Sequence, residues 1–220
     1  MVQRHPSGIT QRIVDKVVAR RGRLHAFPSL DPLRAALVVV DLDLGTGRDD
    51  LARVVTMSEK VNRLSEVLRE RGGKVAWVTT PITQATENFR AVFGDEHTDR
   101  YEADGRSGKA NTLWPELHVV DEDIHVTKTG HSAFMPGKCD LHDRLRALGV
   151  ESLLIAGAVT NVCCEASARD AAESGYRVTM VSDALIGWSK EQDMATFATF
   201  FRCYGDVRPA TDVLKIITRE

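Results

Sequence analysis

Short apolar runs alternate along this chain with segments whose apolar residues have helical spacing. The first run, at residues 35–41, is apolar without interruption, which is typical of a strand covered on both faces. Single helices separate such runs, so the strands are expected to be parallel, with right-handed crossovers. The pattern predicts a three-layer α/β/α sandwich around a mostly parallel, roughly six-stranded sheet. The expected strands lie at residues 35–41, 74–80, 123–128, 152–157, 176–182 and, weakly, 213–217.

Helical spacing marks the segments between these strands. At residues 57–71 the apolar residues fall on one helical face, and Thr56 with Glu59 has the pattern of a capping box. Further helices are expected near residues 141–148, 161–174 and 190–202. Residues 82–112 are polar and irregular, and long enough to form a functional loop.

The first 30 residues differ from the remainder. Six Lys or Arg residues precede Leu24 and only one acid, Asp15, accompanies them. We expect residues 1–30 to form a basic arm with a short amphipathic helix, packed on the body or on a second subunit; a transit peptide is the alternative. Residues 31–220 have the length of one domain.

Overall composition excludes several classes of protein. The chain has 29 Lys and Arg against 31 Asp and Glu, which argues against broad nucleic-acid binding. It has no apolar stretch long enough to span a membrane and no pattern of a secretory signal peptide. Its four cysteines have no metal-binding spacing, so we expect thiols in a reducing, cytoplasmic environment. No cofactor and no metal are expected.

Three chemically distinct residues end or follow the predicted strands. Asp41 ends the first, Lys128 ends the third, and Cys163 follows the fourth. Singly, each has an ordinary interpretation: a turn cap, a solvated strand end and a small buried side chain. Ligands of parallel sheets bind at the carboxyl edge of the strands, and there the three would bring together a base, a cation and a nucleophile.

Cys163 stands in the sequence G-A-V-T-N-V-C-C, with Thr160 or Asn161 as the expected helix N-cap. A sulfur in the first helical turn would be stabilised as a thiolate by the helix dipole and by a nearby Lys. The amides of that turn could hold an oxyanion. This implies acyl transfer through a thioester, followed by hydrolysis. Cys164 is the competing nucleophile, but it points about 100° away around a helix.

At residues 24–217 the chain resembles the isochorismatase-like cysteine hydrolases. The motifs are V-V-V-D-L at 38–42, V-T-K-T-G-H-S-A-F at 126–134, L-L-I-A-G-A-V-T-N-V-C-C-E-A-S-A-R-D-A-A at 153–172 and G-Y-R-V-T-M-V-S-D-A at 175–184. The resemblance implies a catalytic triad, with Asp41 as general acid/base, Lys128 as electrostatic partner and Cys163 as nucleophile. It also implies a cis peptide between Ala158 and Val159, and an oxyanion hole from the N–H groups of Val159 and Cys163.

Within that family, residues 153–172 look closest to the ureido and carbamoyl amide hydrolases, such as ureidoacrylate amidohydrolases and N-carbamoylsarcosine amidases. The resemblance implies an amidohydrolase that cleaves a C–N bond of a small amide, ureide or carbamoyl compound, and assembly as a dimer or tetramer. Two departures are present. Asp43 and Leu44 replace the family's usual polar pair after the catalytic Asp, and the stretch T-T-P-I-T-Q-A-T-E-N-F-R lacks the nicotinamidase D-x-H metal ligands. A nicotinamidase is therefore not expected.

The substrate is not specified by these motifs. Five residues are candidates to line its pocket, and an Arg or His among them would suit a carboxylated substrate: Trp114, His131, Phe134, Trp188 and Arg202.

Three alternatives remain open. Within the family, isochorismatase-type vinyl-ether hydrolysis would use the Asp without the Cys. A haloacid-dehalogenase-type, Mg²⁺-dependent phosphatase would use Asp41, Asp43, Thr79 or Thr80, Lys128 and Asp183, but a glycine occupies position 45 and the Thr comes one residue late, at Thr46. A nucleotide-binding module would rest on Gly45-Thr46-Gly47 alone.

Overall fold

The structure, a computed structural model, describes residues 5–45 and 51–219. Its centre is a six-stranded sheet in which every neighbouring pair is parallel. The order β3-β2-β1-β4-β5-β6 places β1 and β4 in the middle. The strands are β1 Ala35–Val40, β2 Lys74–Thr79, β3 Ile124–Thr127, β4 Ser152–Ala158, β5 Arg177–Ile186 and β6 Asp206–Arg208.

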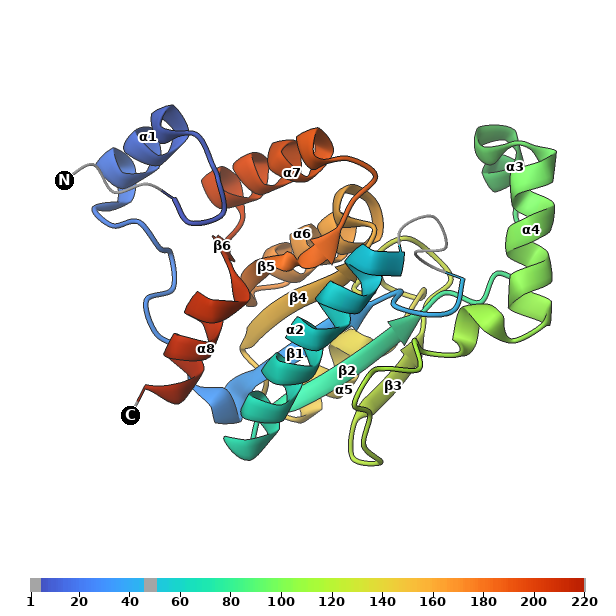
Figure 1. Ribbon diagram of the computed structural model, residues 1–220, viewed down its shortest axis with the longest axis horizontal. Helices are drawn as coiled ribbons and strands as arrows, with labels where there is room; N and C mark the ends of the chain where they lie inside the picture. Colours follow the sequence, from blue (N-terminus) through green and yellow to red (C-terminus); the bar gives the residue numbers. More distant parts are fainter. Residues whose placement is uncertain (1–4, 46–50, 220) are drawn as a thin grey trace.

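Helices cover both faces of the sheet, which confirms the three-layer sandwich (Figure 1). One layer consists of α2 Leu51–Glu70 and α8 Ala210–Thr218, and the other contains α5 Leu141–Ala147, α6 Glu165–Glu173 and α7 Lys190–Cys203. Successive residues of β1 alternate between these two cores, as strand geometry requires. Within the described residues, no helix is both long enough and apolar enough to cross a membrane.

Three elements differ from the expectation. The sixth strand lies at β6, and residues 213–217 belong to α8, because Val213, Ile216 and Ile217 have i, i+3, i+4 spacing and are buried together. The helix α2 begins at Leu51, so Thr56 lies inside it and its hydroxyl donates to the Ala52 carbonyl (3.0 Å) rather than capping. Residues 82–112 are largely helical: α3 (Glu87–Phe93) and α4 (Asp95–Arg106) stand away from the sheet, at the right of Figure 1.

A close approach between β1 and β4 depends on Gly157. Gly157 pairs with Val40 and has φ of +116°, in the region that favours glycine. A Cβ built on Gly157 would lie 2.0 Å from the Val40 carbonyl oxygen, so no other residue fits. The contact presses the end of β1, and therefore Asp41, against the start of the segment that carries Cys163.

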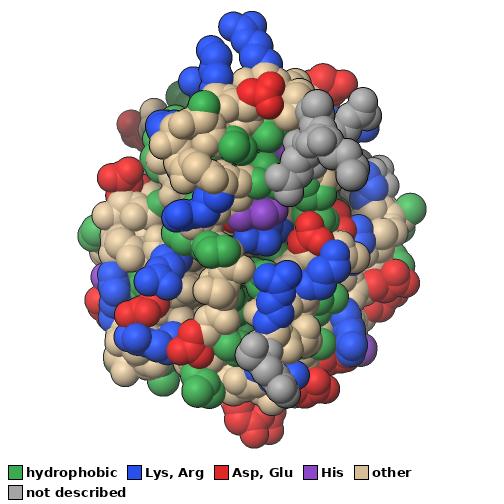
Figure 2. Space-filling view, turned by 90° about the vertical axis from the view of Figure 1, so that its left-hand side faces the viewer, with side chains coloured by type: hydrophobic (Ala, Val, Ile, Leu, Met, Phe, Trp, Pro, Cys, Tyr) green, Lys and Arg blue, Asp and Glu red, His purple; other side chains and the backbone are tan. Residues whose placement is uncertain are grey.

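The arm at residues 5–30 packs on the body. Its helix α1 (Gln11–Arg21) lies against α7, and the His5 ring is buried with its centroid 4.6 Å from that of Phe201. Figure 2 shows the side of the molecule that includes this arm, where Lys and Arg are interspersed with Asp and Glu. The basic residues of the arm therefore do not extend into a single positive patch on this face.

Substitution of Gly157 by Ala should destabilise the fold by about 3 kcal/mol or more, because the new methyl group would overlap the β1 backbone. Gly149→Ala is the matched control: its φ is +70°, but no atom lies within 4 Å of the added Cβ, so only the backbone penalty of about 1–2 kcal/mol applies. Urea denaturation midpoints measure both. Equal midpoints for the two variants would contradict the close approach.

His5 should make stability depend on pH. Burial lowers the pKa of His5 from 6.5 to about 4, helped by His25, Arg21 and Arg208 and opposed by Asp206. The unfolded chain therefore binds the extra proton first, and stability falls as pH drops from about 6.5 to about 4. His5→Gln should lose about 2 kcal/mol less than the wild type between pH 7.5 and 5, by urea denaturation. Parallel losses in both proteins would contradict this; His118→Gln, at an exposed histidine, is the control.

Candidate active site

Four side chains meet at the carboxyl edge of the sheet. Asp41 follows β1, Thr80 follows β2, Lys128 follows β3, and Cys163 lies in the turn after β4. Because these strands are parallel neighbours, their ends lie side by side even though Asp41 and Cys163 are far apart in the sequence. Asp41 has φ of +49°, a left-handed conformation that Asp tolerates better than most residues and that marks a constrained position.

The Lys128 ammonium lies at the centre of this group. Only 1% of Lys128 is exposed, and its Nζ lies 2.9 Å from Asp41 Oδ2, 2.5 Å from Thr80 Oγ1 and 3.4 Å from Cys163 Sγ. The Gly130 carbonyl accepts from the same ammonium at 3.2 Å. Burial alone would lower the pKa of Lys128, but the Asp41 charge and the hydrogen bonds to Asp41 and Cys163 outweigh it and the pKa is raised. Lys128 is therefore held as a cation.

Thr80 is a site residue that the triad pattern does not reveal. Its hydroxyl donates to Asp41 Oδ1 (2.6 Å) and accepts from Lys128, so both carboxylate oxygens of Asp41 have a partner. In the sequence, Thr80 stands at the end of the second predicted strand, and only the phosphatase alternative assigns it a role. Thr80 fixes the orientation of the carboxylate toward the thiol.

Cys163 lies in a π-helical turn, Thr160–Cys164, that leads into α6. The expected N-cap at Thr160 or Asn161 is wrong, because Val159 takes that position without a side-chain cap. The expected thiolate is wrong as well: burial, then the Asp41 charge, raise the pKa of the Cys163 thiol to about 12, and Lys128 only partly opposes them. The resting nucleophile is a neutral thiol that shares a hydrogen bond with Asp41.

The surroundings of the thiol agree with its placement in the turn. Cys164 is fully buried in the core on the other side of the turn, whereas Cys163 is partly exposed. The peptide bond between Ala158 and Val159 is cis, as the resemblance implied. The N–H groups of Val159 and Cys163 belong to this same short segment, which is where an oxyanion hole is predicted.

The five residues predicted to line a substrate pocket differ in how near they lie to Asp41 and Cys163. His131 is exposed, and its Nδ1 lies 3.8 Å from Cys163 Sγ. Trp188 is 65% exposed just beyond β5, and the main-chain N–H of Trp114 donates to the Leu42 carbonyl (3.1 Å) beside Asp41. Two others are elsewhere: Phe134 is a core residue packed edge-on against Tyr176, and Arg202 lies in the last turn of α7, where its main-chain carbonyl accepts from the Arg20 guanidinium.

Tyr101 lies on the projecting helix α4. Burial raises the pKa of Tyr101, and Cys163, Asp41 and Asp43 raise it further. Its ring is 40% exposed and packs edge-on against Phe89 of α3, with centroids 5.8 Å apart. Residues 82–112 thus hold an aromatic cluster on two helices, which no local sequence pattern indicated.

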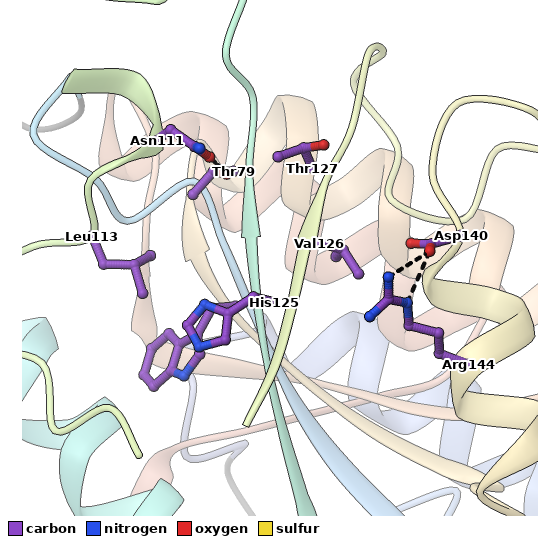
Figure 3. A pocket seen from close by; sticks show the side chains of 9 residues that line it. Thr79, Asn111, Leu113, His125, Val126, Thr127, Asp140 and Arg144 are labelled. Atoms are coloured by element: carbon purple, nitrogen blue, oxygen red, sulfur yellow. Dashed lines mark hydrogen bonds and ion pairs between the residues drawn. The ribbon is translucent and has the colours of Figure 1, made fainter. Parts of the chain in front are cut away.

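A pocket of about 410 Å³ lies at the outer edge of β3 (Figure 3). It is lined by Thr79 and Asn111, which share a hydrogen bond of 2.6 Å, and by the ion pair of Asp140 with Arg144 (2.8 Å). None of Asp41, Lys128 and Cys163 lines it. The group formed by Asp41, Lys128 and Cys163 therefore lies outside this pocket.

The acids of the phosphatase alternative are engaged elsewhere. The Asp43 carboxylate accepts from the Gly45 N–H (2.8 Å), and Asp183 pairs with Lys60 (3.1 Å) and accepts from the Ala210 N–H at the start of α8. Thr46 and Gly47 lie outside the described residues. Within residues 5–45 and 51–219, no three His, Cys, Asp or Glu side chains are grouped so that they could hold a metal ion.

Comparison with known proteins gives one consistent family. The isochorismatase domain model matches residues 35–212. The isochorismatase family protein YwoC of Bacillus subtilis is 29% identical over 191 residues, which cover 85% of this chain and 96% of YwoC. A cysteine hydrolase structure from Pseudomonas syringae pv. phaseolicola superposes with a TM-score of 0.77 at 23% identity, over 89% of this chain and 97% of that one.

Two relatives of stated activity match shorter segments. Nicotinamidase 3 of Arabidopsis thaliana is 37% identical over 78 residues, 36% of this chain and 38% of that protein. The ureidoacrylate amidohydrolase RutB of Agrobacterium fabrum is 42% identical over 69 residues, 31% of this chain and 29% of RutB. Neither match extends over the whole site.

Asp41→Asn should accelerate alkylation of Cys163 by iodoacetamide at pH 8. Removing the negative charge leaves Lys128 unopposed beside the sulfur, which lowers the pKa of the thiol and raises its thiolate fraction by at least about tenfold. Peptide mass spectrometry measures the rate at Cys163 separately from the other cysteines. Asp121→Asn, at an exposed acid, should label like the wild type. Slower labelling in Asp41→Asn would mean that this carboxylate does not act on the sulfur.

Proposed function

The chain belongs to the isochorismatase family, and we propose that it is a cysteine-dependent hydrolase that cleaves a C–N bond of a small amide, ureide or carbamoyl compound. The observation that carries the proposal is the Lys128 ammonium, within 2.9 Å of Asp41 and 3.4 Å of Cys163. It joins a base and a nucleophile in one buried group. In this proposal Asp41, Lys128 and Cys163 are the catalytic residues, and no cofactor takes part.

In the first step the sulfur attacks the carbonyl carbon of the substrate. Because the thiol is neutral at rest, its proton passes to Asp41 as the C–S bond forms. The carbonyl oxygen becomes an oxyanion, and the N–H groups of Val159 and Cys163 are proposed to hold it. Asp41 then gives its proton to the nitrogen, the C–N bond breaks, and an amine or ammonia leaves behind a thioester on Cys163.

Lys128 pairs with the Asp41 carboxylate, which in this proposal accepts the thiol proton. A buried carboxylate without a cation would itself become protonated and could not act as a base. The ammonium also lies next to the sulfur, where it stabilises negative charge that develops during attack. Both effects require that Lys128 stay protonated, which its raised pKa supports.

Three considerations favour C–N hydrolysis over the alternatives. Vinyl-ether hydrolysis needs no thiol, so it leaves the Cys163 contact with Lys128 without a purpose. Nicotinamidase activity would agree with the partial match to Nicotinamidase 3, but the segment after β2 lacks the D-x-H ligands of that branch. The phosphatase alternative is incompatible with the family and with the engagement of Asp183 by Lys60.

Cys163→Ala should abolish hydrolysis in a panel of small amides, ureides and carbamoyl compounds, whereas Cys164→Ala should keep most of it. Cys164 is buried and only loses a small packed side chain, at a stability cost of about 1 kcal/mol. Amine or ammonia release measures turnover, and intact-protein mass spectrometry detects the acyl adduct. Hydrolysis that persists in Cys163→Ala would overturn the thioester route, and activity only on a vinyl ether would overturn the C–N assignment.

A further inference from the structure

His131 contacts the nucleophile from outside the buried group. Its Nδ1 lies 3.8 Å from Cys163 Sγ, within hydrogen-bond range for sulfur. The hydrogen bonds that Asp41, Thr80 and Lys128 make with one another do not involve His131. The sulfur therefore has two potential proton partners, Asp41 on its buried side and an imidazole on its exposed side.

The loop that carries His131 is anchored on both sides of it. The Gly130 carbonyl accepts from Lys128 Nζ (3.2 Å), and the Ala133 N–H donates to Ser167 Oγ of α6 (2.9 Å). Phe134, one residue further, is buried in the core. Only two residues lie between the two anchors, so the backbone at His131 is fixed relative to the thiol and the ring contact does not depend on a free loop.

The two proton partners differ in their access to water. Asp41 is 9% exposed, and each of its carboxylate oxygens already accepts a hydrogen bond, from Lys128 and from Thr80. His131 is exposed. After the amine has left, a water molecule must reach the thioester from solvent, and it must lose a proton as it attacks. The group that meets such a water at the sulfur is His131.

We infer that His131 is a catalytic residue of thioester hydrolysis, an inference that rests on the proposed function. As the water oxygen bonds to the thioester carbon, the imidazole takes one proton from the water. The C–S bond then breaks, the sulfur leaves with the bonding electron pair, and the imidazolium returns that proton to Sγ. The products are a carboxylic or carbamic acid and the free thiol, so neither an oxidant nor another reactant is required.

The test separates the two half-reactions with p-nitrophenyl acetate as the probe. Acetylation of Cys163 releases p-nitrophenolate, and after rapid removal of the ester, intact-protein mass spectrometry follows the loss of the acetyl group. In His131→Asn we expect acetylation at a rate close to that of the wild type and deacetylation about 100-fold slower. His125→Asn, at an exposed histidine of β3, is the matched control and should behave like the wild type.

Imidazole provides a readout that a merely structural role would not change. Added to the acetylated His131→Ala variant, it should accelerate loss of the acetyl group, and the same addition should have little effect on the wild type. A variant in which the loop had simply shifted would not be rescued.

The possible failures point to different conclusions. Deacetylation at the wild-type rate in His131→Asn, or equal slowing of acetylation and deacetylation, overturns the role of His131 and leaves the proposed function intact. If no acetyl group is found on Cys163 in any of the proteins, and Cys163→Ala hydrolyses the ester and the amide panel like the wild type, the thioester route itself is wrong.

Discussion

A buried ammonium group connects the ends of four strands in this protein. An unpaired charge in the interior is unfavourable by several kcal/mol, so Lys128 requires partners, and it finds them on the segments that follow β1, β2, β3 and β4. The same contacts that satisfy the cation place Asp41 beside Cys163. Fold stability and site geometry thus depend on one interaction, and loss of either charge would leave the other buried without compensation.

The cation does not, however, turn the sulfur into a thiolate. The positive charge of Lys128 is closest to Asp41 and Thr80, at 2.9 and 2.5 Å, and only then to Cys163 at 3.4 Å. Burial and the Asp41 carboxylate outweigh it, so the pKa of the thiol lies at about 12. A nucleophile that is neutral at rest resists adventitious alkylation and oxidation, because both require thiolate. In the proposed reaction, it becomes reactive when a carbonyl group arrives and its proton moves to Asp41.

Much of the fold could be predicted because buried parallel strands have uninterrupted apolar sequences, and Asp41, Lys128 and Cys163 were recognised at the ends of such strands. The misassignments have physical causes. Residues 213–217 are apolar enough for a strand, and only their packing on α2 shows a helix, while β6 is three residues long and contains Asp206 and Arg208, which pair with each other. Thr80 acts through tertiary contacts with Asp41 and Lys128 that no local pattern encodes, and the raised thiol pKa depends on burial, which spacing alone does not give.

The sulfur's surroundings are asymmetric, and the asymmetry follows from the topology. Its buried neighbours, Asp41 and Lys128, come from strand ends and are 9% and 1% exposed. Its exposed neighbour comes from a loop that begins at one of those strand ends and is anchored again at α6. In the proposed reaction, a proton taken by Asp41 stays on the buried side of the sulfur and is available to the departing nitrogen, whereas a proton carried by His131 is exchanged on the exposed side. A single sulfur between these two environments would thereby meet the opposite requirements of forming a thioester and hydrolysing it.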